Sequence, residues 1–585
     1  MKKKKRGFTL VELLAVIVIL AVILVIAVPR IMSVIKDAKL GSIESTAKLI
    51  ASTAESRYES KKALGLDVGD LKCTDVASLS NDYGKCKITF DDNGVATVIV
   101  NGKKDGKFNN LVCSGTKDNM TCTEGEISTA RKCTTTNALV YGLKFVDGQY
   151  TYTYNSSSQG WRVVLTNKLS TDPVTTELCG TINDKPIVDI SWMFSDSKAK
   201  NINLSSFDTS NVTNMSYMFY GSAATSLDLS NFDTSKVTNM AEMFRESAAT
   251  EIKGLEDFDT SKVTNMEGMF ASSKATEIKG LENFNTSKVT DMSNMFSYSA
   301  ATSIDVSNFD TSKVTNMGYM FSKSKATSID VSGFNTSNVT NMIRMFYNSA
   351  ATEIKGLENF NTSNVTSMFG MFDSSAAISL DLSNFNTSNV TTMESMFSRS
   401  KAPTLDLSSF DTSNVTDMMY MFDNSAATEI KGLEKFNTSK VTDMSRMFSS
   451  SKVTTLNLSS FDTSKVTNMS TMFLSSAATE IKGLEKFNTS KVTDMNGMFS
   501  SSKVTTLNLS SFDTSKVTDM SNMFYGSKAT TLDLSSFDTS SVTDMKQMFW
   551  NSKITTGYAR TQEDADRFNA SSNKPSELTF VVKSQ

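Results

Sequence analysis

The sequence predicts a multidomain α+β protein, in which a long N-terminal helix and a small disulfide-containing β head precede a solenoid of stacked repeats. Three observations support this prediction. An apolar run begins at Phe8, all six cysteines lie between residues 73 and 179, and a motif of 25 or 26 residues recurs from about residue 191 onward. A repeat of that length is typical of solenoids, in which each coil buries its apolar face against the next coil.

Composition and charge exclude several classes of function. The 585 residues include 59 basic and 62 acidic side chains and no histidine. Without histidine, His-based catalytic triads, His zinc sites and His general bases are excluded. Residues 1–7 hold five of the basic side chains, so the rest of the chain is net acidic. We expect no nucleic-acid binding, because phosphate contacts need clustered Lys or Arg, and we expect no metal or other cofactor.

The N-terminal segment is long and apolar enough for a membrane span. Residues Phe8 to Val28 are apolar except for Thr9 and Glu12. At about 1.5 Å per residue they form a helix of roughly 32 Å, which spans a bilayer. The basic leader, residues 1–7, is expected to stay cytoplasmic and to place the following chain outside. Glu12 is unexpected here, because a carboxylate in a lipid-facing helix costs about 2.5–3.5 kcal/mol or more.

The segment GFTLVELL sets a small residue, an aromatic residue and a carboxylate at fixed distances. Gly7 ends the basic leader, Phe8 follows it, Glu12 lies five residues after Gly7, and Pro29 ends the apolar run. This pattern resembles the N-terminal motif of type IV prepilins and related pseudopilins. The resemblance implies cleavage after Gly7, N-methylation of Phe8, and docking of Glu12 against the amine of a neighbouring subunit's Phe8. A plain signal anchor with a stray Glu is the alternative.

An amphipathic pattern extends the predicted helix, residues 8–58, beyond the apolar run. In pilins such a segment is the lower half of a long helix that packs on a small β head. Residues 59–128 are predicted to form that head, and KCKITFDDNGVATVIVNG indicates a hairpin that turns at Asn93-Gly94. The apolar residues at helical spacing are Ile31, Val34, Ile35, Ala38, Ile43, Ala47, Ile50, Ala51 and Ala54.

The cysteine pattern indicates disulfides rather than a metal site. An even number of cysteines outside the membrane favours disulfides, and CxxC pairs typical of zinc sites are absent. Six cysteines allow 15 pairings, and free thiols in a small core are the alternative. Sequence proximity favours the pairs Cys73–Cys86, Cys113–Cys122 and Cys133–Cys179.

A β-rich unit is predicted between the head and the repeats, at residues 129–190. The stretch GLKFVDGQYTYTYNSSSQGWRVVL alternates aromatic or β-branched residues with polar ones, and DG and SSSQG mark its turns. We expect this unit to connect the head to the repeats or to cap them.

The repeats occupy residues 191–557 as about 14 full units of 25 or 26 residues. One unit, from Phe207, reads FDTSNVTNMSYMFYGSAATSLDLSN. Met215, Met218 and Phe219 fall on one face of a helix, so VTNMSYMF is predicted as a short helix whose Met and Phe side chains form the core. A Met-rich binding groove is the alternative interpretation of these side chains.

The second half of each unit is predicted as a strand. Leu227 and Leu229 alternate with polar residues, as in a half-buried strand, and stacked units would form a continuous parallel ladder. The 26-residue units carry EIKGLE, whose extra residue is consistent with a bulge after the strand. The Asp of F-D-T-S, such as Asp208, suggests a calcium ladder, yet Asn replaces it in six of fourteen units. A turn needs only a side-chain oxygen, so we favour a turn at this position.

The motif F-[DN]-T-S-x-V-T-x-M-x-x-M-F, followed by L-D-L-S, covers about 360 residues almost without gaps. It resembles the BspA-type leucine-rich-repeat surface proteins of bacteria, also found in mycoplasmal surface lipoproteins. The resemblance implies a leucine-rich-repeat α/β solenoid, a parallel strand ladder plus short helices, and attachment to host or matrix molecules. This chain departs from the family by lacking a cysteine in the turn between helix and strand.

Variable positions beside the Met-Phe pair are the candidate binding surface. They carry aromatic or Arg side chains in some units and small residues in others, and such side chains dominate binding hot spots. Drift at exposed positions is the alternative. The candidate ligand-binding residues are Tyr217, Tyr220, Arg245, Tyr319, Arg344, Tyr347, Tyr420, Tyr525 and Trp550.

The C-terminal segment, residues 558–585, departs from the repeat and is predicted to cap the stack. Glu563 to Phe568 is expected to form a short helix, and Leu578 to Val582 a last strand. Solenoids need such a cap over the exposed end of their core.

These features together predict a non-enzymatic bacterial surface protein, a minor type IV pilin or pilin-like protein that displays the repeats as an adhesive domain. It would cross the cytoplasmic membrane once before assembly and expose its repeats outside the cell. Expected partners are other pilin subunits, the prepilin peptidase/methylase, the membrane, and an unidentified host, matrix or glycan ligand. The alternatives are a membrane-anchored surface protein that never enters a filament and a polysaccharide-acting enzyme on a parallel β-helix.

Overall fold

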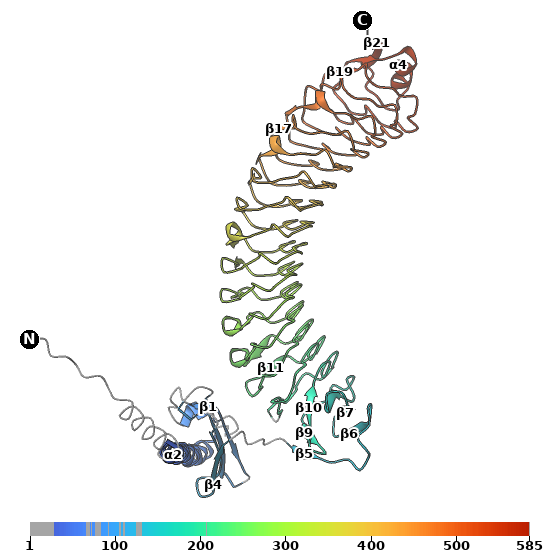
Figure 1. Cartoon of the computed structure of the whole chain (residues 1–585). Coiled ribbons are helices and arrows are strands. Elements are labelled where there is room, and N and C mark those ends of the chain that lie inside the picture. Colours follow the sequence, from blue (N-terminus) through green and yellow to red (C-terminus); the bar gives the residue numbers. More distant parts are fainter. Residues whose placement is uncertain are drawn as a thin grey trace, which may run out of the picture. The chain divides into compact units, whose positions relative to one another are not determined.

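The chain folds into two compact units, Met1–Thr129 and Ala130–Gln585, which are drawn in Figure 1 and are described separately. The structure is a computed structural model. It describes residues 28–65, 71, 73–76, 83–91, 93–103, 107–108, 111–124, 131–205 and 207–583.

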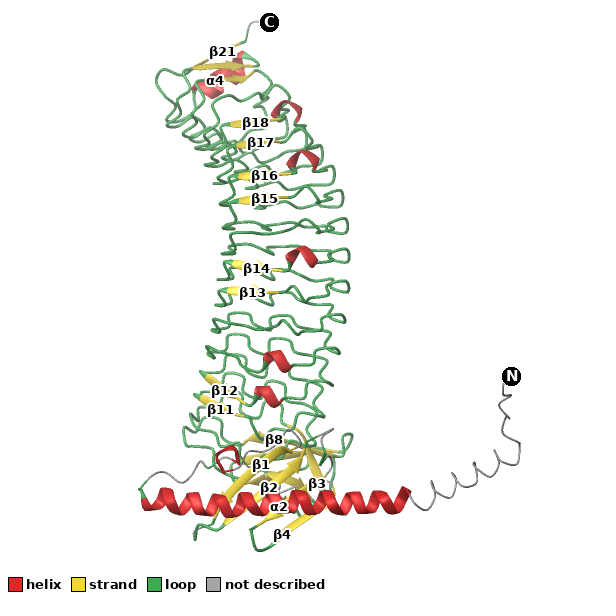
Figure 2. Ribbon diagram, turned by 90° about the vertical axis from the view of Figure 1, so that its left-hand side faces the viewer, coloured by secondary structure: helices red, strands yellow, loops and turns green. Residues whose placement is uncertain are grey.

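The first unit packs helix α2 (Val28–Ala63) against a four-stranded antiparallel sheet. Figure 2 shows the helix lying along this sheet. The sheet order is β1-β2-β3-β4, and β1 and β2 form the predicted hairpin, in which Asn93 donates its N–H to Asp91 Oδ1 (2.9 Å) and Gly94 is left-handed (φ 82°). The elements are α3 (Cys73–Val76), β1 (Tyr83–Phe90), β2 (Ala96–Gly102), β3 (Leu111–Gly115) and β4 (Met120–Glu124).

The predicted apolar face of α2 packs only along part of the helix. From Ile43 to Ala54 its apolar residues are buried against strand residues such as Val98. Val34 and Ile35, which have the same spacing, are 66% and 50% exposed. The sheet therefore covers the second half of the helical stripe and leaves the earlier residues uncovered within this unit.

The predicted membrane span and its processing motif lie outside the described residues, since Gly7, Phe8 and Glu12 all precede Val28. Within the part of the chain that is described, no helix combines the length and the apolar character that a membrane crossing requires.

Three disulfides form with the pairing that sequence proximity favours. Cys73–Cys86 and Cys113–Cys122 lie in the first unit, and Cys133–Cys179 lies in the second. The described residues include no free cysteine. The alternative of free thiols is therefore wrong.

The second unit begins with a six-stranded sheet of order β5-β9-β10-β8-β7-β6. Tyr150, Tyr152 and Trp161 fill its core, and the Trp161 indole N–H donates to the carbonyl of Ile182 (3.1 Å). The Tyr150 ring also lies 6.1 Å from Phe207 of the first coil, so this core continues into the repeats. The strands are β5 (Arg131–Cys133), β6 (Lys144–Asp147), β7 (Tyr150–Asn155), β8 (Gly160–Leu165), β9 (Cys179–Ile182) and β10 (Lys185–Asp189).

The coils that follow are held in register by a continuous ladder of parallel bridges. The ladder joins Asp189 to Asn214, joins Asn214 to Asn239, and continues coil by coil to Asp544. Each bridge residue also closes a turn with its side chain, as where Ser216 donates its N–H to Asn214 Oδ1 (3.1 Å). This need for a side-chain oxygen explains why the bridge residues are Asn, Asp, Ser or Thr.

The short helix predicted over VTNMSYMF is wrong, because this segment is a succession of tight turns. Met218 donates its N–H to the carbonyl of Met215 in the same coil (3.3 Å), whereas Tyr217 donates to Ala241 in the next coil (2.9 Å). An α-helix would keep both bonds within the segment. Left-handed backbone at Tyr217 (φ 58°) and Gly221 (φ 59°) turns alternate N–H groups toward the neighbouring coil. The repeats therefore form a β-solenoid with few helices.

The predicted strand forms in only some of the coils. Strand β11 (Ser226–Asp228) pairs in parallel with β12 (Glu251–Lys253), and similar pairs recur along the stack without joining into one ladder. After β12, left-handed Gly254 (φ 85°) opens a single 3₁₀ turn, η2 (Leu255–Asp257), which absorbs the extra residue of EIKGLE in place of the expected bulge. A Cβ on Gly254 would lie 2.4 Å from the Ser230 nitrogen. The other elements are η3 (Leu281–Asn283), β13 (Ser328–Asp330), β14 (Glu353–Lys355), η4 (Leu357–Asn359), β15 (Thr404–Asp406), β16 (Glu429–Lys431), η5 (Leu433–Lys435), β17 (Thr455–Asn457), β18 (Glu480–Lys482) and η6 (Leu484–Lys486).

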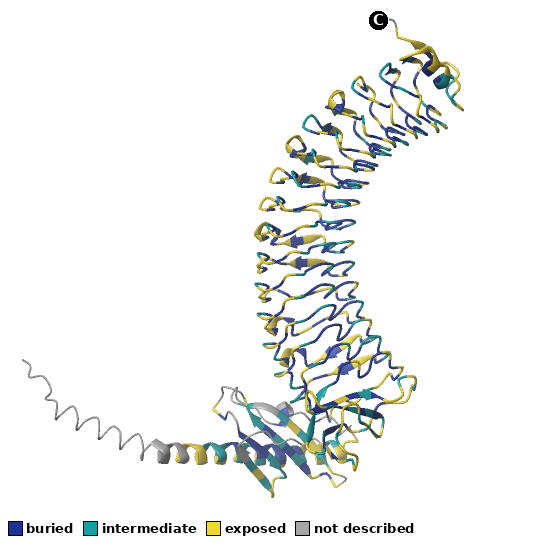
Figure 3. Ribbon diagram, turned by 45° about the vertical axis from the view of Figure 1, so that its right-hand side comes forward, coloured by how far each residue is buried: buried dark blue, intermediate teal, exposed yellow. Residues whose placement is uncertain are grey.

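Phenylalanine rings stack in two columns in the core, and buried residues recur in every coil (Figure 3). Met215, Met218 and Phe219 are fully buried, so the prediction that this stripe is core is confirmed. Ring centroids are 5.3–6.0 Å apart in the Met-Phe column, and they are 6.1–6.4 Å apart in those neighbouring pairs of F-[DN]-T-S rings that stack.

The C-terminal segment covers the last coil with the predicted helix and strand. Helix α4 (Gln562–Asn569) and strand β21 (Thr579–Val582) follow strands β19 (Thr531–Leu534) and β20 (Thr556–Ala559). Phe549, the last ring of the Met-Phe column, packs against Phe568 and Phe580, with centroids 6.0 and 4.9 Å away. The apolar end of the stack is thereby covered.

Candidate ligand-binding surface

Each coil presents two left-handed residues on its turn segment, four positions apart. One lies just before the Met-Phe pair and the other lies two residues after it, as Tyr217 and Gly221 do in the first full unit. Left-handed backbone is cheap for Gly and tolerable for Asn, but it is unfavourable for bulky residues. The identity of the residue at these positions is therefore informative.

The nine predicted binding residues all lie on this turn segment, but they do not form one continuous surface. Tyr217, Tyr319, Arg344 and Tyr420 occupy the first left-handed position. The other five directly follow the Met-Phe pair. Neighbouring coils bring most of them into separate clusters with side chains that the sequence analysis did not single out.

The first cluster lies at the beginning of the stack. The Trp192 ring is stacked on Tyr217, with centroids 3.9 Å apart and planes 6° apart, and Tyr220 lies 6.1 Å from Tyr217. Arg245 lies 5.8 Å from the Tyr220 ring and forms an ion pair with Glu242 (3.1 Å). The cluster thus joins exposed aromatic faces to an arginine whose charge is already paired.

The second cluster alternates cations and rings over four consecutive coils, and we name it the cation–aromatic ladder. Lys323 Nζ lies 4.5 Å from the ring centre of Tyr298 and 5.5 Å from that of Tyr347. The Arg344 guanidinium lies 4.9 Å from Tyr347 and 4.5 Å from Phe369. Lys323 also donates to the Tyr298 hydroxyl (2.6 Å), and this bond is the main cause that raises the lysine pKa. Lys323 therefore stays charged at neutral pH.

The remaining predicted residues form smaller groups. Arg446 lies 5.3 Å from the Tyr420 ring, and Trp550 packs edge-on against Tyr525 at 5.7 Å. Within the described chain, Tyr319 makes no ring or cation contact of this kind.

Sequence reasoning missed five partners that complete these clusters. They occupy repeat positions on the same turn segment. An alignment that included the second left-handed position and the partial first unit would have found Tyr298, Lys323 and Trp192, whereas Arg446 lies at the first left-handed position and Phe369 directly follows the first Met of its unit. The missed residues are Trp192, Tyr298, Lys323, Phe369 and Arg446.

The acidic residue of F-D-T-S closes a turn, as the sequence favoured. Ser210 donates its N–H to Asp208 Oδ1 (3.0 Å), and Ser287 donates in the same way to Asn285 Oδ1 (3.2 Å). Asp and Asn therefore accept the same backbone hydrogen bond at this position, which explains why either residue occurs there.

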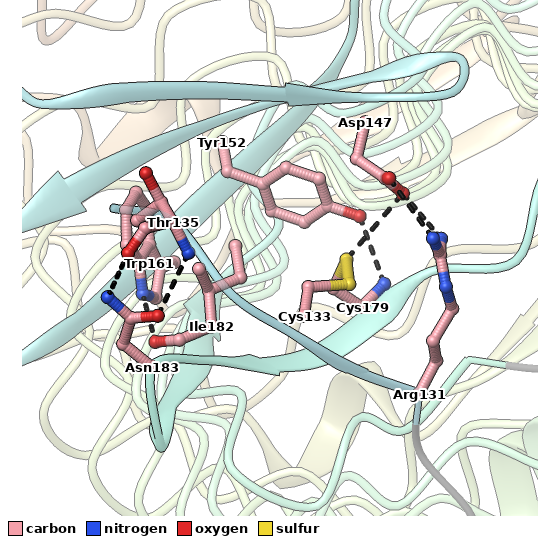
Figure 4. The surroundings of a disulfide bond; sticks show 9 residues. All are labelled: Arg131, Cys133, Thr135, Asp147, Tyr152, Trp161, Cys179, Ile182 and Asn183. Atoms are coloured by element: carbon pink, nitrogen blue, oxygen red, sulfur yellow. Dashed lines mark hydrogen bonds and ion pairs between the residues drawn. A yellow bond between two sulfur atoms is a disulfide. The ribbon is translucent and has the colours of Figure 1, made fainter. Parts of the chain in front are cut away.

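The Cys133–Cys179 disulfide lies among polar groups near the start of the second unit (Figure 4). Cys133, Cys179 and Asp147 are close enough to share a metal ion. The disulfide removes both thiolates, so this group does not offer a metal site. Arg131 instead pairs with Asp147, and the backbone N–H of Cys179 donates to the Tyr152 hydroxyl (3.0 Å).

Comparison with known families places the repeats and the N-terminus separately. A family model described as "Mycoplasma protein of unknown function, DUF285" matches residues 171–279, 271–356, 348–452, 420–502 and 474–574. The chain belongs to this family. The DUF285 matches run from the end of the connecting sheet, through the coils, into the C-terminal cap. No curated protein matches the chain.

A second model, described as a prokaryotic N-terminal methylation motif, matches residues 2–28. This range contains Gly7, Phe8 and Glu12, so the prepilin-type motif is supported by a comparison independent of the structure. The more specific assignments, to BspA-type leucine-rich repeats and to a pilin, stay predictions.

Proposed function

We propose that this protein is a non-enzymatic surface protein, a minor pilin-like subunit whose DUF285 repeats act as an adhesive, ligand-binding domain. One observation carries the proposal. A prepilin-type methylation motif and a solenoid with clustered aromatic and cationic side chains occur in the same chain. The three disulfides support exposure outside the cytoplasm, because the cytosol keeps thiols reduced.

Assembly would depend on Glu12. A carboxylate in the apolar run is costly in lipid, and the cost is offset when the amine of a neighbouring subunit's Phe8 pairs with it. The long solenoid would crowd the side of a densely packed filament. We therefore propose a position at the tip, or at sparse points, rather than the main shaft subunit.

The adhesive role is tested by separating display from binding. Cells that express residues 1–128 alone are compared with cells that express the whole chain, and piliation and attachment are measured separately. We expect normal piliation with reduced attachment. Normal attachment by normally piliated cells lacking the repeats would contradict the adhesive role.

A membrane-retained surface protein that never enters a filament is the second candidate, because a basic leader followed by an apolar run would also serve as a plain signal anchor. The Glu12→Ala variant distinguishes the two, with Thr9→Ala in the same apolar run as the matched control. A filament subunit should lose surface display on filaments with Glu12→Ala and keep it with Thr9→Ala. Unchanged display of both variants favours the membrane-retained protein.

A polysaccharide-acting enzyme is the third candidate. Because the Met-Phe segment is not helical, it no longer argues against a parallel β-helix. The sequence still gathers no unique cluster of acidic residues in any one unit, whereas glycoside hydrolysis uses a dedicated carboxylate pair. Cleavage of polysaccharides by the purified protein would favour the enzyme.

A further inference from the structure

We propose that the cation–aromatic ladder binds an acidic polysaccharide. The rings of Tyr298, Tyr347 and Phe369 would contact sugar faces, and Lys323 and Arg344 would pair with carboxylate or sulfate groups. This inference rests on the proposed function and names the class of ligand that the repeats recognise.

The two ladder cations are positively charged without an acidic partner. Among the described residues, neither Lys323 nor Arg344 forms an ion pair, whereas Arg245 of the first cluster pairs with Glu242 and Glu246. The carboxylates of Asp373 and Glu394 are near enough to feel the charge of Arg344, but neither forms an ion pair with it, and buried Asp373 lies 3.8 Å from Arg399 instead. The ladder therefore offers its charge to an external anion, and the first cluster does not.

The backbone conformation shows that the ladder side chains are not chosen for stability. Tyr298, Lys323 and Arg344 all have positive φ, at 56°, 53° and 51°. Left-handed backbone is unfavourable for a bulky L-residue, because its Cβ crowds the following carbonyl oxygen. Some coils outside the ladder place residues that tolerate it better at these two positions, such as Asn424, Gly497 and Asn522.

A buried, unpaired nitrogen of Arg344 also indicates that this side chain is not there for stability. The Arg344 Nε lies buried without a hydrogen-bond partner, and an unpaired buried donor is costly. Partly exposed residues with an unfavourable backbone conformation or an unpaired polar atom are typical of functional sites. Drift would instead favour the small and polar residues seen in other coils.

The order of rings and cations in the cation–aromatic ladder indicates which class of ligand it would bind. Rings and cations alternate in space along the ladder, from Tyr298 through Lys323, Tyr347 and Arg344 to Phe369. The ladder therefore matches a linear polymer that carries both ring faces and regularly spaced anions. Aromatic faces supply apolar contact area, and a guanidinium held between rings forms charge-assisted hydrogen bonds with carboxylate or sulfate. A nucleic acid fits less well, because the chain is net acidic and the ladder holds only two cations.

Full-length protein in detergent micelles is tested against hyaluronan, dextran sulfate, neutral dextran and single-stranded DNA. The ladder variant is Y298N/K323N/R344N, because Asn tolerates left-handed backbone. The control variant is K274N/K528N, which removes two exposed lysines from other coils of the same stack. Affinity and the unfolding midpoint are measured for each variant.

We expect binding to hyaluronan or dextran sulfate but not to neutral dextran, weakened by about tenfold or more in the ladder variant alone. The unfolding midpoint of that variant should be unchanged or higher. If it fails to fold, K323Q/R344Q provides the same comparison with long side chains kept. Equal binding by wild type and ladder variant, an equal loss in the control, or tighter binding of DNA would overturn the proposal.

The two proposals can fail separately. If acidic polysaccharides do not bind while attachment still requires the repeats, the adhesive role stands and the ligand class is wrong. If attachment does not require the repeats, the proposed function itself fails.

Discussion

At the scale of single residues, a threonine at one buried position links each coil to the next. Thr412 donates its hydroxyl to the carbonyl of Asn437 (3.0 Å) and accepts the N–H of the same residue (2.8 Å). The Thr of F-[DN]-T-S makes the same contact in other coils, as Thr209 does with Asp233 (2.9 Å). One side chain thus satisfies both backbone groups of the next coil's turn.

Thr412→Val should destabilise the fold although it preserves the shape of the side chain. The carbonyl and N–H of Asn437 would lose their partner in a partly buried place, which costs about 1–3 kcal/mol. Thr416→Val is the control, because exposed Thr416 makes a similar bond to Thr391 (3.1 Å) that water can replace. Chemical denaturation should show the larger loss for Thr412→Val, and equal losses would contradict a special role for the buried position.

The bridge ladder contains carboxylates whose charge is unfavourable. Burial, together with the charge of Asp519, raises the pKa of Asp494, although its bond from the Asn496 N–H (2.8 Å) opposes the shift. In other coils Asn occupies this position, as Asn468 does, and closes the same turn. The charge of Asp494 is therefore not needed for the turn.

Asp494→Asn should stabilise the protein at neutral pH by up to about 1 kcal/mol, as expected when a like-charge contact is removed. Because folding raises the pKa of Asp494, its ionised carboxylate destabilises the folded wild-type protein at pH values above that pKa. The gain should therefore disappear as pH falls below the usual Asp value. Asp513→Asn should instead destabilise the protein at neutral pH, because hydrogen bonds from Ser515 favour the ionised carboxylate and lower the pKa of Asp513. Denaturation midpoints of both variants, measured between pH 3 and 7, test the predicted gain and the predicted loss. If the stability gain of Asp494→Asn persists in acid, the charge of Asp494 is not its cause.

At the scale of elements, the sequence predicted the repeat period, the core stripe, the hairpin, the disulfides and the capping elements. It did not predict the turns of the Met-Phe segment, because the spacing of Met215, Met218 and Phe219 suits an α-helix and a series of three-residue turns equally well. A usable signal was present, since Gly268 and Gly370 stand between the two methionines, where a helix disfavours glycine.

The binding clusters were predictable only in part. Aromatic and Arg residues could be located by position in the repeat, but their pairing depends on the second left-handed position. Tyr298 and Lys323 lie there, and nothing in the periodicity assigns that position a shared surface with Arg344. Contacts between coils required the structure.

The C-terminal cap depends on one carboxylate, which takes the place of the hydrogen-bond acceptor that a further coil would supply. Asp564 accepts the N–H (3.0 Å) and hydroxyl (2.7 Å) of Thr539, and Thr561 and Arg560 also donate to it. Burial opposes its ionisation, but these hydrogen bonds prevail and lower its pKa to about 2. The cap thus reproduces the threonine contact that every earlier coil makes.

Asp564→Asn should destabilise the cap by about 2 kcal/mol at neutral pH, the value of a pKa lowered from 3.8 to about 2. With a lowered folded pKa, this stabilisation is complete above pH 3.8 and is lost as pH falls toward 2. The difference between wild type and variant should shrink over that range. Hydrogen exchange in α4 measures it, with exposed Asp566→Asn as control. A difference independent of pH would show that the charge of Asp564 is not the cause.

At the scale of the whole molecule, each coil contacts only its neighbours, so a complete coil is a removable unit. Deletion of residues 385–409 joins Asn384 to Phe410, and deletion of residues 309–333 joins Asn308 to Phe334. Both deletions preserve the repeat register and remove 25 residues. Only the second removes Lys323 from the cation–aromatic ladder.

Both deletions should leave a folded protein with a similar unfolding midpoint, because stability in such stacks is roughly a sum of equal coil and interface terms. Deletion of residues 385–396 breaks the register and should prevent folding of the coils that follow. Among the folded variants, only the deletion of residues 309–333 should weaken binding to hyaluronan or dextran sulfate. Equal binding by the two whole-coil deletions would show that the ligand recognises the stack in general, and it would separate the solenoid as a scaffold from the ladder as its binding site.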